Sequence, residues 1–116
     1  MGRRGASLKS DARFDARVRV VKAMAHPTRM FIVEELSRVP ERCVCELTEM
    51  VGDDMSTVSK HLALLKKAGL VSDEKRGNLV YYRLRVPCIL EFFRCVESVL
   101  ACNGTGTAQS CCGSRG

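Results

Sequence analysis

Up to residue 68, apolar side chains recur every three or four residues, which is the spacing of an amphipathic helix. The pattern predicts helices over about 13–25, 27–39, 43–51 and 57–68. Pro27 separates the first two, because proline disfavours helical geometry in the residue before it and suits the first position of the next helix. Gly69 stands where a left-handed C-terminal cap of the fourth helix is expected.

After Gly69 the period changes. Residues 70–76 and 79–85 are predicted to be strands, and Gly77-Asn78 between them is a hairpin signal. Pro87 begins a last helix that runs to about Cys102 and is apolar around most of its circumference, which indicates a dimer interface. The expected fold class is therefore mainly α with a small β-hairpin, in a homodimer.

The third and fourth helices, joined by a tight turn, match a helix-turn-helix, and the hairpin after them matches a wing. In that motif the second helix enters the DNA major groove. The predicted DNA contacts on this helix and at the wing tip are Ser56, Thr57, Ser59, Lys60, His61, Arg76 and Asn78. We divide the chain into a flexible basic arm (1–12), a winged helix-turn-helix domain with a terminal dimerisation helix (13–102) and a flexible cysteine-containing tail (103–116).

Composition and charge fit this interpretation. The chain has 116 residues, 46% of them hydrophobic, which is enough for one domain. The net charge is +6, and basic residues gather in 1–22 and 55–85, around an acidic block. Such a layout suits a polyanion partner, because lysines and arginines that neutralise phosphates release counterions. The chain shows no apolar run of transmembrane length and no apolar segment of a secretory signal near its start, so we expect a cytoplasmic protein.

Seven cysteines are many for this length, and an odd number without an export signal argues for reduced thiols. A Cys-x-Cys and a Cys-Cys pair would also suit a thiol oxidoreductase or a metal carrier. No βαβ pattern surrounds the pairs, and we find no Ser/His/Asp set, glycine-rich phosphate loop or paired carboxylates. The sequence therefore predicts a binding protein and not an enzyme.

Five stretches together resemble the ArsR/SmtB family over roughly residues 15–100. They are Ala25-His26-Pro27-Thr28-Arg29, Cys43-Val44-Cys45-Glu46-Leu47, Ser56 to Leu65, Ala68-Gly69-Leu70-Val71 and Gly77 to Leu84. The resemblance implies a dimeric winged-helix repressor that leaves its palindromic operator when a metal or metalloid ion binds. It also places Ser56 to His61 on the family's recognition helix and Arg76 to Asn78 on its wing.

The Cys43-Val44-Cys45 stretch resembles the arsenite- and cadmium-sensing branches of the family. The resemblance implies As(III) or Sb(III) as inducer, with Cd(II) or Pb(II) as alternatives, and these soft ions suit thiolates. A third cysteine that the arsenite branch often carries is replaced here by Thr48. On a regular helix Cys43 and Cys45 would point about 200° apart. They can therefore share one ion only if the start of the helix is extended.

The third ligand stays open at the sequence level. An extended tail could bring Cys111 or Cys112 to the pair, and Cys95 and Cys102 on the last helix are alternatives. Their seven-residue spacing more often means packing. The paired thiols could also sense persulfides or oxidants on the same fold, which requires accessible thiols of low pKa.

Overall fold

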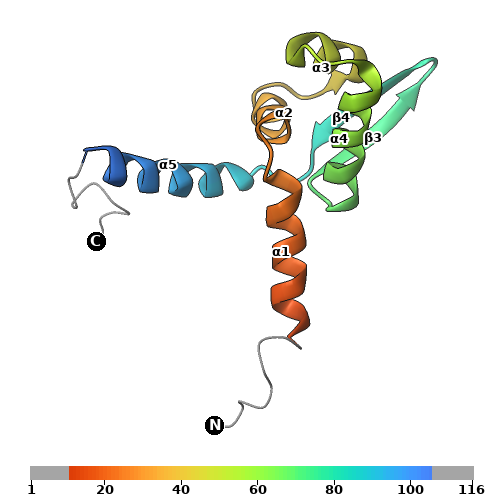
Figure 1. The fold of residues 1–116 in the computed structure, drawn as a ribbon. Coiled ribbons are helices and arrows are strands. Elements are labelled where there is room, and N and C mark those ends of the chain that lie inside the picture. The colour runs from red at the N-terminus through yellow and green to blue at the C-terminus, as the bar shows by residue number, and fades with distance from the viewer. Residues whose placement is uncertain (1–10, 106–116) are drawn as a thin grey trace. The chain divides into compact units, whose positions relative to one another are not determined.

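The computed structural model describes the backbone of residues 11–105 and the side chains of residues 11–102. The chain divides between Arg85 and Val86 into two compact units, which are described separately. In chain order the first contains α1 (Ala12–Met24), α2 (Pro27–Arg38), β2 (Arg42–Cys43), α3 (Val44–Val51), α4 (Met55–Lys67), β3 (Val71–Arg76) and β4 (Leu79–Leu84) (Figure 1). The second contains α5 (Ile89–Thr105).

Local capping explains where the helices start and stop. The His26 imidazole Nδ1 accepts a hydrogen bond from the Thr28 backbone N–H at 3.1 Å, and Pro27 takes the first helical position of α2. The Asp54 side chain accepts from the Thr57 backbone N–H and so caps α4. Gly69 follows α4 with φ +88°, a left-handed conformation that glycine adopts without steric cost. These observations confirm the expected breaks at Pro27 and Gly69.

The core of the first unit lies among α2, α3, α4 and the sheet. One apolar face from each helix meets there, and its members are almost fully buried: Ile32, Val33, Leu36, Leu47, Val58, Leu62 and Leu65. The last three are the stripe that the sequence predicts for the fourth helix. Their burial fixes which side of α4 faces inward and therefore which side faces solvent.

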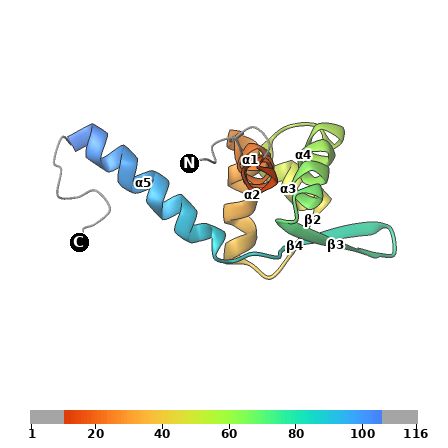
Figure 2. The ribbon, with the colours of Figure 1, turned by 90° about the horizontal axis from the view of Figure 1, so that it is seen from below.

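The sheet has the order β2-β4-β3, and both pairs are antiparallel. In both views the tip of the β3–β4 hairpin projects beyond the helices (Figures 1 and 2). The hairpin confirms the predicted wing. Strand β2 was not predicted, because two residues are too few to show a period; its Cys43 lies opposite Tyr81 of β4. This strand ties the start of α3 to the wing.

Three predicted boundaries are wrong by a few residues. Asp11 caps α1 and Ala12 belongs to it, so the end of the predicted arm is structured. Helix α5 begins at Ile89 instead of Pro87 and continues through Thr105, which includes the first residues of the predicted tail. The rest of the arm and tail lies outside the described residues. Within residues 11–105, no helix is long and apolar enough to cross a membrane.

Candidate nucleic-acid interface and thiol pair

The outer face of α4 begins with hydroxyl groups that serve its cap. The Ser56 hydroxyl donates to Asp54, and the Thr57 Oγ1 donates to Asp54 Oδ1 at 2.7 Å. These bonds from Ser56 and Thr57 lower the pKa of Asp54 to about 2. Both hydroxyl oxygens keep lone pairs with which to accept a further hydrogen bond. The two predicted contacts therefore lie at the N-terminus of α4, where their hydroxyl groups donate to the Asp54 carboxylate, which stays ionised.

Ser59 and Lys60 complete the exposed side of α4. Both are exposed, and within the described part of the chain Lys60 makes no ion pair. Its ammonium group is therefore available to a phosphate without first breaking a contact. The structure brings Ser56, Thr57, Ser59 and Lys60 onto the same helix turns, as the sequence predicts.

His61 lies differently from the other predicted contacts. Its ring is 4.5 Å from the His26 ring, and its Nδ1 accepts a hydrogen bond from Arg29 Nη1 at 3.2 Å. Burial, followed by the positive charges of His26 and Arg29, lowers the pKa of His61. The half-buried imidazole is thus engaged with α2 and its cap.

The wing carries Arg76 and Asn78 at opposite sides of its turn. Arg76 makes two hydrogen bonds to the Glu41 carboxylate, at 2.8 and 2.6 Å, and one to Glu74 at 3.1 Å. Its guanidinium also lies over the Tyr81 ring, 4.4 Å from the centroid. Arg76 is therefore already paired, whereas Asn78 and Lys75 are exposed at the tip, and their side chains make no hydrogen bond within the described residues.

The two thiols of the Cys-x-Cys stretch lie at the start of α3. Cys43 is the N-cap of α3, with extended backbone (φ −81°, ψ 162°), and Cys45 is in the first turn. The Cys43 thiol is buried and that of Cys45 is exposed. A hydrogen bond with Cys43, then desolvation, raises the pKa of Cys45. The extended backbone that the sequence requires for a shared ion is therefore present at Cys43, whereas Cys45 has helical geometry.

An ion-pair network that the sequence did not predict holds this stretch in place. Glu35 of α2 is buried and bonds to Arg38 at 2.7 Å and to Arg42 at 3.0 and 2.9 Å. The Cys43 backbone N–H donates to Glu46 Oε1 at 3.0 Å, and Arg42 lies 3.6 Å from the same carboxylate. The available signal in the sequence was Glu35, which stands among the apolar residues of the second helix and is followed by Arg38 and Arg42. Because isolated carboxylates are rarely buried, a glutamate in such a place needs cationic partners.

The other cysteines do not complete a site in the described residues. Cys88 and Cys95 belong to the second unit and are free and exposed. No group of three or more His, Cys, Asp or Glu side chains within residues 11–102 is placed to hold a metal ion. Cys111 and Cys112 lie outside the described residues. The Cys43 and Cys45 thiols at the start of α3 are therefore the two members of the predicted ligand set that the structure describes.

Comparison with known proteins now decides the family. Residues 26–73 match the family described as "Bacterial regulatory protein, arsR family". The arsenical resistance operon repressor of Escherichia coli is 38% identical over 104 residues, which cover 83% of this chain and 89% of the relative. The chain belongs to the ArsR family. As an ArsR-family protein it is a transcriptional regulator, and its helix-turn-helix with a wing is confirmed.

Two further relatives show how widely the ArsR family fits this chain. A homodimeric winged helix-turn-helix DNA-binding domain from Mycobacterium bovis, solved by NMR, superposes with a TM-score of 0.68 at 31% identity and covers 83% of this chain and 88% of its own. A cadmium resistance regulatory protein CadC homolog from Staphylococcus aureus is 41% identical over 66 residues, or 57% of this chain and 54% of the relative. Arsenical and cadmium regulators of the ArsR family are thus both similar to it.

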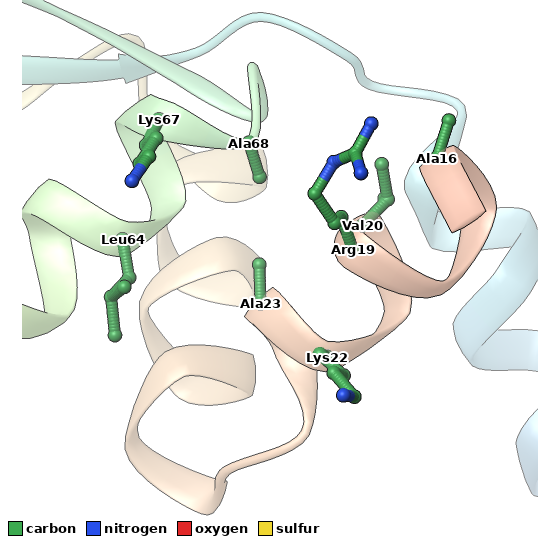
Figure 3. Close-up of a pocket in the computed structure, with 8 residues that line it drawn as sticks. All are labelled: Ala16, Arg19, Val20, Lys22, Ala23, Leu64, Lys67 and Ala68. Atoms are coloured by element: carbon green, nitrogen blue, oxygen red, sulfur yellow. The ribbon is translucent and has the colours of Figure 1, made fainter. Parts of the chain in front are cut away.

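The ArsR-family fold also leaves an apolar hollow between α1 and the C-terminal half of α4. It measures about 500 Å³. Figure 3 shows its lining, with alanines, Val20 and Leu64 from the two helices and three cationic side chains around them: Ala16, Arg19, Val20, Lys22, Ala23, Leu64, Lys67 and Ala68. The predicted DNA contacts occupy the other end of α4, so the hollow lies apart from them.

Proposed function

We propose that this ArsR-family protein is a cytoplasmic repressor that binds operator DNA as a homodimer and is released by As(III) or Sb(III). The observation that carries the inducer is the extended backbone of Cys43 at the start of α3, two residues before Cys45. Trivalent arsenic and antimony are thiophilic and bind thiolates. Ligating thiols must lose their protons when the ion binds. Because Cys43 is the N-cap of α3, ion binding at its thiol acts on the start of that helix.

The DNA-binding part of the proposal rests on α4 and the wing. Ser56, Thr57, Ser59 and Lys60 present hydroxyls and a free cation from the N-terminal turns of α4, which suit base edges and phosphates. Asn78 and Lys75 stand at the tip of the wing. We propose that Arg76 and His61 act mainly by holding the wing and α4 in position, because both are engaged within the protein.

Exposed apolar side chains support the homodimer. On α1, Phe14, Val18 and Val21 recur at helical spacing and are 39–48% exposed. On α5, Val99 and Leu100 are 55% and 62% exposed. Apolar surface of this kind is characteristic of an interface between subunits. The homodimeric relative from Mycobacterium bovis agrees with this assembly.

Two other kinds of inducer could act on the same fold. Cd(II) or Pb(II) would also bind the thiol pair, and the CadC-like relative keeps that reading open. A persulfide or oxidant sensor needs an accessible thiol of low pKa. Cys45 is the accessible thiol here, and Cys43 raises its pKa, so the low-pKa condition of an oxidant sensor is not met. We propose Cys111 or Cys112 as the third thiolate, with Cys95 as the alternative; Cys102, the other alternative from the sequence, is disulfide-bonded in the structure.

Fluorescence anisotropy of the reduced protein on a labelled fragment of its own promoter tests the proposal. As(III), Sb(III), Cd(II), Pb(II) and a persulfide donor are titrated against wild type, Cys43→Ser and Cys45→Ser. Cys88→Ser, which removes an exposed thiol outside the pair, is the matched control. A Cys111→Ser/Cys112→Ser double variant asks whether the tail supplies the third sulfur.

We expect As(III) and Sb(III) to release wild type and Cys88→Ser while Cys43→Ser and Cys45→Ser stay bound. Release by Cd(II) or the persulfide alone would leave the fold and overturn the inducer. No salt-sensitive DNA binding at all would overturn the repressor and make thiol exchange the next activity to assay.

A further inference from the structure

Glu41, the residue before β2, forms ion pairs with arginines on both strands of the wing. One of its carboxylate oxygens, Oε1, is 2.6 Å from Arg76 Nη2 and 3.1 Å from Arg83 Nη2, and Oε2 accepts from Arg76 Nη1 at 2.8 Å. Arg76 ends β3 and Arg83 lies in β4. The pairs span 35 and 42 residues of sequence, and a two-pronged arginine–carboxylate contact is the most directional ion pair in proteins.

The next two residues hold the other side of the same stretch. Arg42 is bonded to the buried Glu35 of α2, and Cys43 caps α3 through its backbone contact with Glu46. Both also pair with β4, Arg42 opposite Tyr82 and Cys43 opposite Tyr81. Three consecutive residues therefore contact the wing, α2 and the start of α3, and the third of them bears one of the two adjoining thiols.

We propose that Glu41 is a positioning residue that transmits the state of the Cys43–Cys45 pair to the wing. This inference rests on the proposed function, since it assumes that an ion bound at the pair lowers DNA affinity. An ion that draws the two sulfurs together moves the backbone at Cys43, because this residue is both N-cap and strand. Strand β2 has only two residues. Its short ladder needs a second connection to carry the displacement, and the Glu41 carboxylate provides it.

Loss of this contact is expected to change the coupling between ion binding and DNA binding, and not DNA binding itself. Without the Glu41 carboxylate, Arg76 and Arg83 keep only Glu74, a partner on the wing itself, at 3.1 and 3.3 Å. The hairpin is then no longer joined to the residue before β2, while both arginines stay on the wing, so DNA binding without inducer persists. What falls is the ratio between the dissociation constants for DNA with and without the ion, which is the coupling factor.

The test compares Glu41→Gln with Glu34→Gln in the full-length protein. Glu34 is an exposed carboxylate on α2 whose side chain makes no hydrogen bond within the described residues, so it controls for the lost charge. Arg83→Gln removes the second arginine of the contact while leaving β2 untouched. Anisotropy gives DNA affinity with and without As(III). Hydrogen exchange of the peptide spanning 71–84 reports the wing directly, with and without the ion.

Allosteric coupling factors are typically about 5–150-fold, and we expect Glu41→Gln to bring the wild-type factor at least about threefold closer to one. Arg83→Gln should act in the same direction, and Glu34→Gln should match wild type. As(III) should speed exchange in the wing of wild type and of Glu34→Gln but leave Glu41→Gln unchanged. Binding of As(III) itself should be retained in all four proteins.

Two results would overturn the inference. An unchanged coupling factor in Glu41→Gln, with DNA affinity lowered equally with and without the ion, would make the contact merely structural. An ion-dependent change in wing exchange that persists in Glu41→Gln would show that another route carries the signal. A wild-type protein that does not bind the promoter, or is not released by any ion, would instead refute the proposed function, and the two failures are told apart by the wild type alone.

Discussion

Replacing Lys60 with glutamine should make DNA binding less sensitive to salt. Lys60 is exposed on the N-terminal half of α4 and has no ion pair among the described residues. Each cation that neutralises a phosphate releases condensed counterions, and this release is what salt opposes. A free lysine on the helix that enters the groove should therefore contribute fully to the salt dependence.

The size of the effect follows from the proposed dimer. Each phosphate contact contributes about 0.9 to the slope of log affinity against log salt. Two Lys60 side chains in a homodimer should thus reduce the slope by about 1.8 when both are replaced. The assay is anisotropy on the promoter fragment at five or more salt concentrations. The wild-type and Lys60→Gln lines should converge as salt rises, because the variant has less electrostatic affinity to lose.

Lys66→Gln is the matched control on the same helix. Lys66 lies in the last turn of α4 and is paired with Asp73 at 3.1 Å. Its loss changes the net charge equally but should leave the slope within about 0.3 of wild type, because Lys66 neutralises no phosphate and so releases no counterions. Equal slope changes in both variants would refute the proposed interface, since the effect would then come from net charge and not from the placement of Lys60.

Three further predictions concern the fold that supports the site. Glu35→Gln should lower the free energy of unfolding by about 2–3 kcal/mol in urea titrations, because Arg38 and Arg42 lose their carboxylate partner, and their partial exposure to water limits the cost. A loss under about 0.5 kcal/mol would mean that the network adds no net stability. Gly69→Ala should cost about 1–2 kcal/mol in the same assay, since its φ of +88° disfavours a side chain, while the added Cβ would meet Arg85 Nη1 at an ordinary contact distance of 3.5 Å. An unchanged midpoint would contradict this. The pKa of His61 is lowered in the folded protein, so the unfolded chain binds the proton more readily; stability present above pH 6.5 should therefore fall as the pH drops below it, and His61→Gln should flatten urea midpoints measured between pH 7.5 and 5.

The order of elements follows from the sequence, because local signals specify it. The helical period places α1, α2, α3 and α4 within a few residues, and the alternation around Gly77 places the wing. Pro27 and Gly69 act through their own backbone preferences, which do not depend on the rest of the fold. The buried stripe of α4 was readable for the same reason, since three apolar residues at helical spacing have one common face.

What those residues do was decided by contacts between distant parts of the chain. Arg76 and His61 are predicted DNA contacts by position, and only the fold shows that Arg76 Nη1 and Nη2 bond to Glu41 and that His61 Nδ1 bonds to Arg29. Strand β2 exists only because β4 is there to pair with it. That pairing comes with an extended backbone at Cys43, so the Cys43-Val44-Cys45 stretch departs from the regular helix that spacing alone would give it. No local pattern encodes this, because the partner strand β4 lies far along the chain.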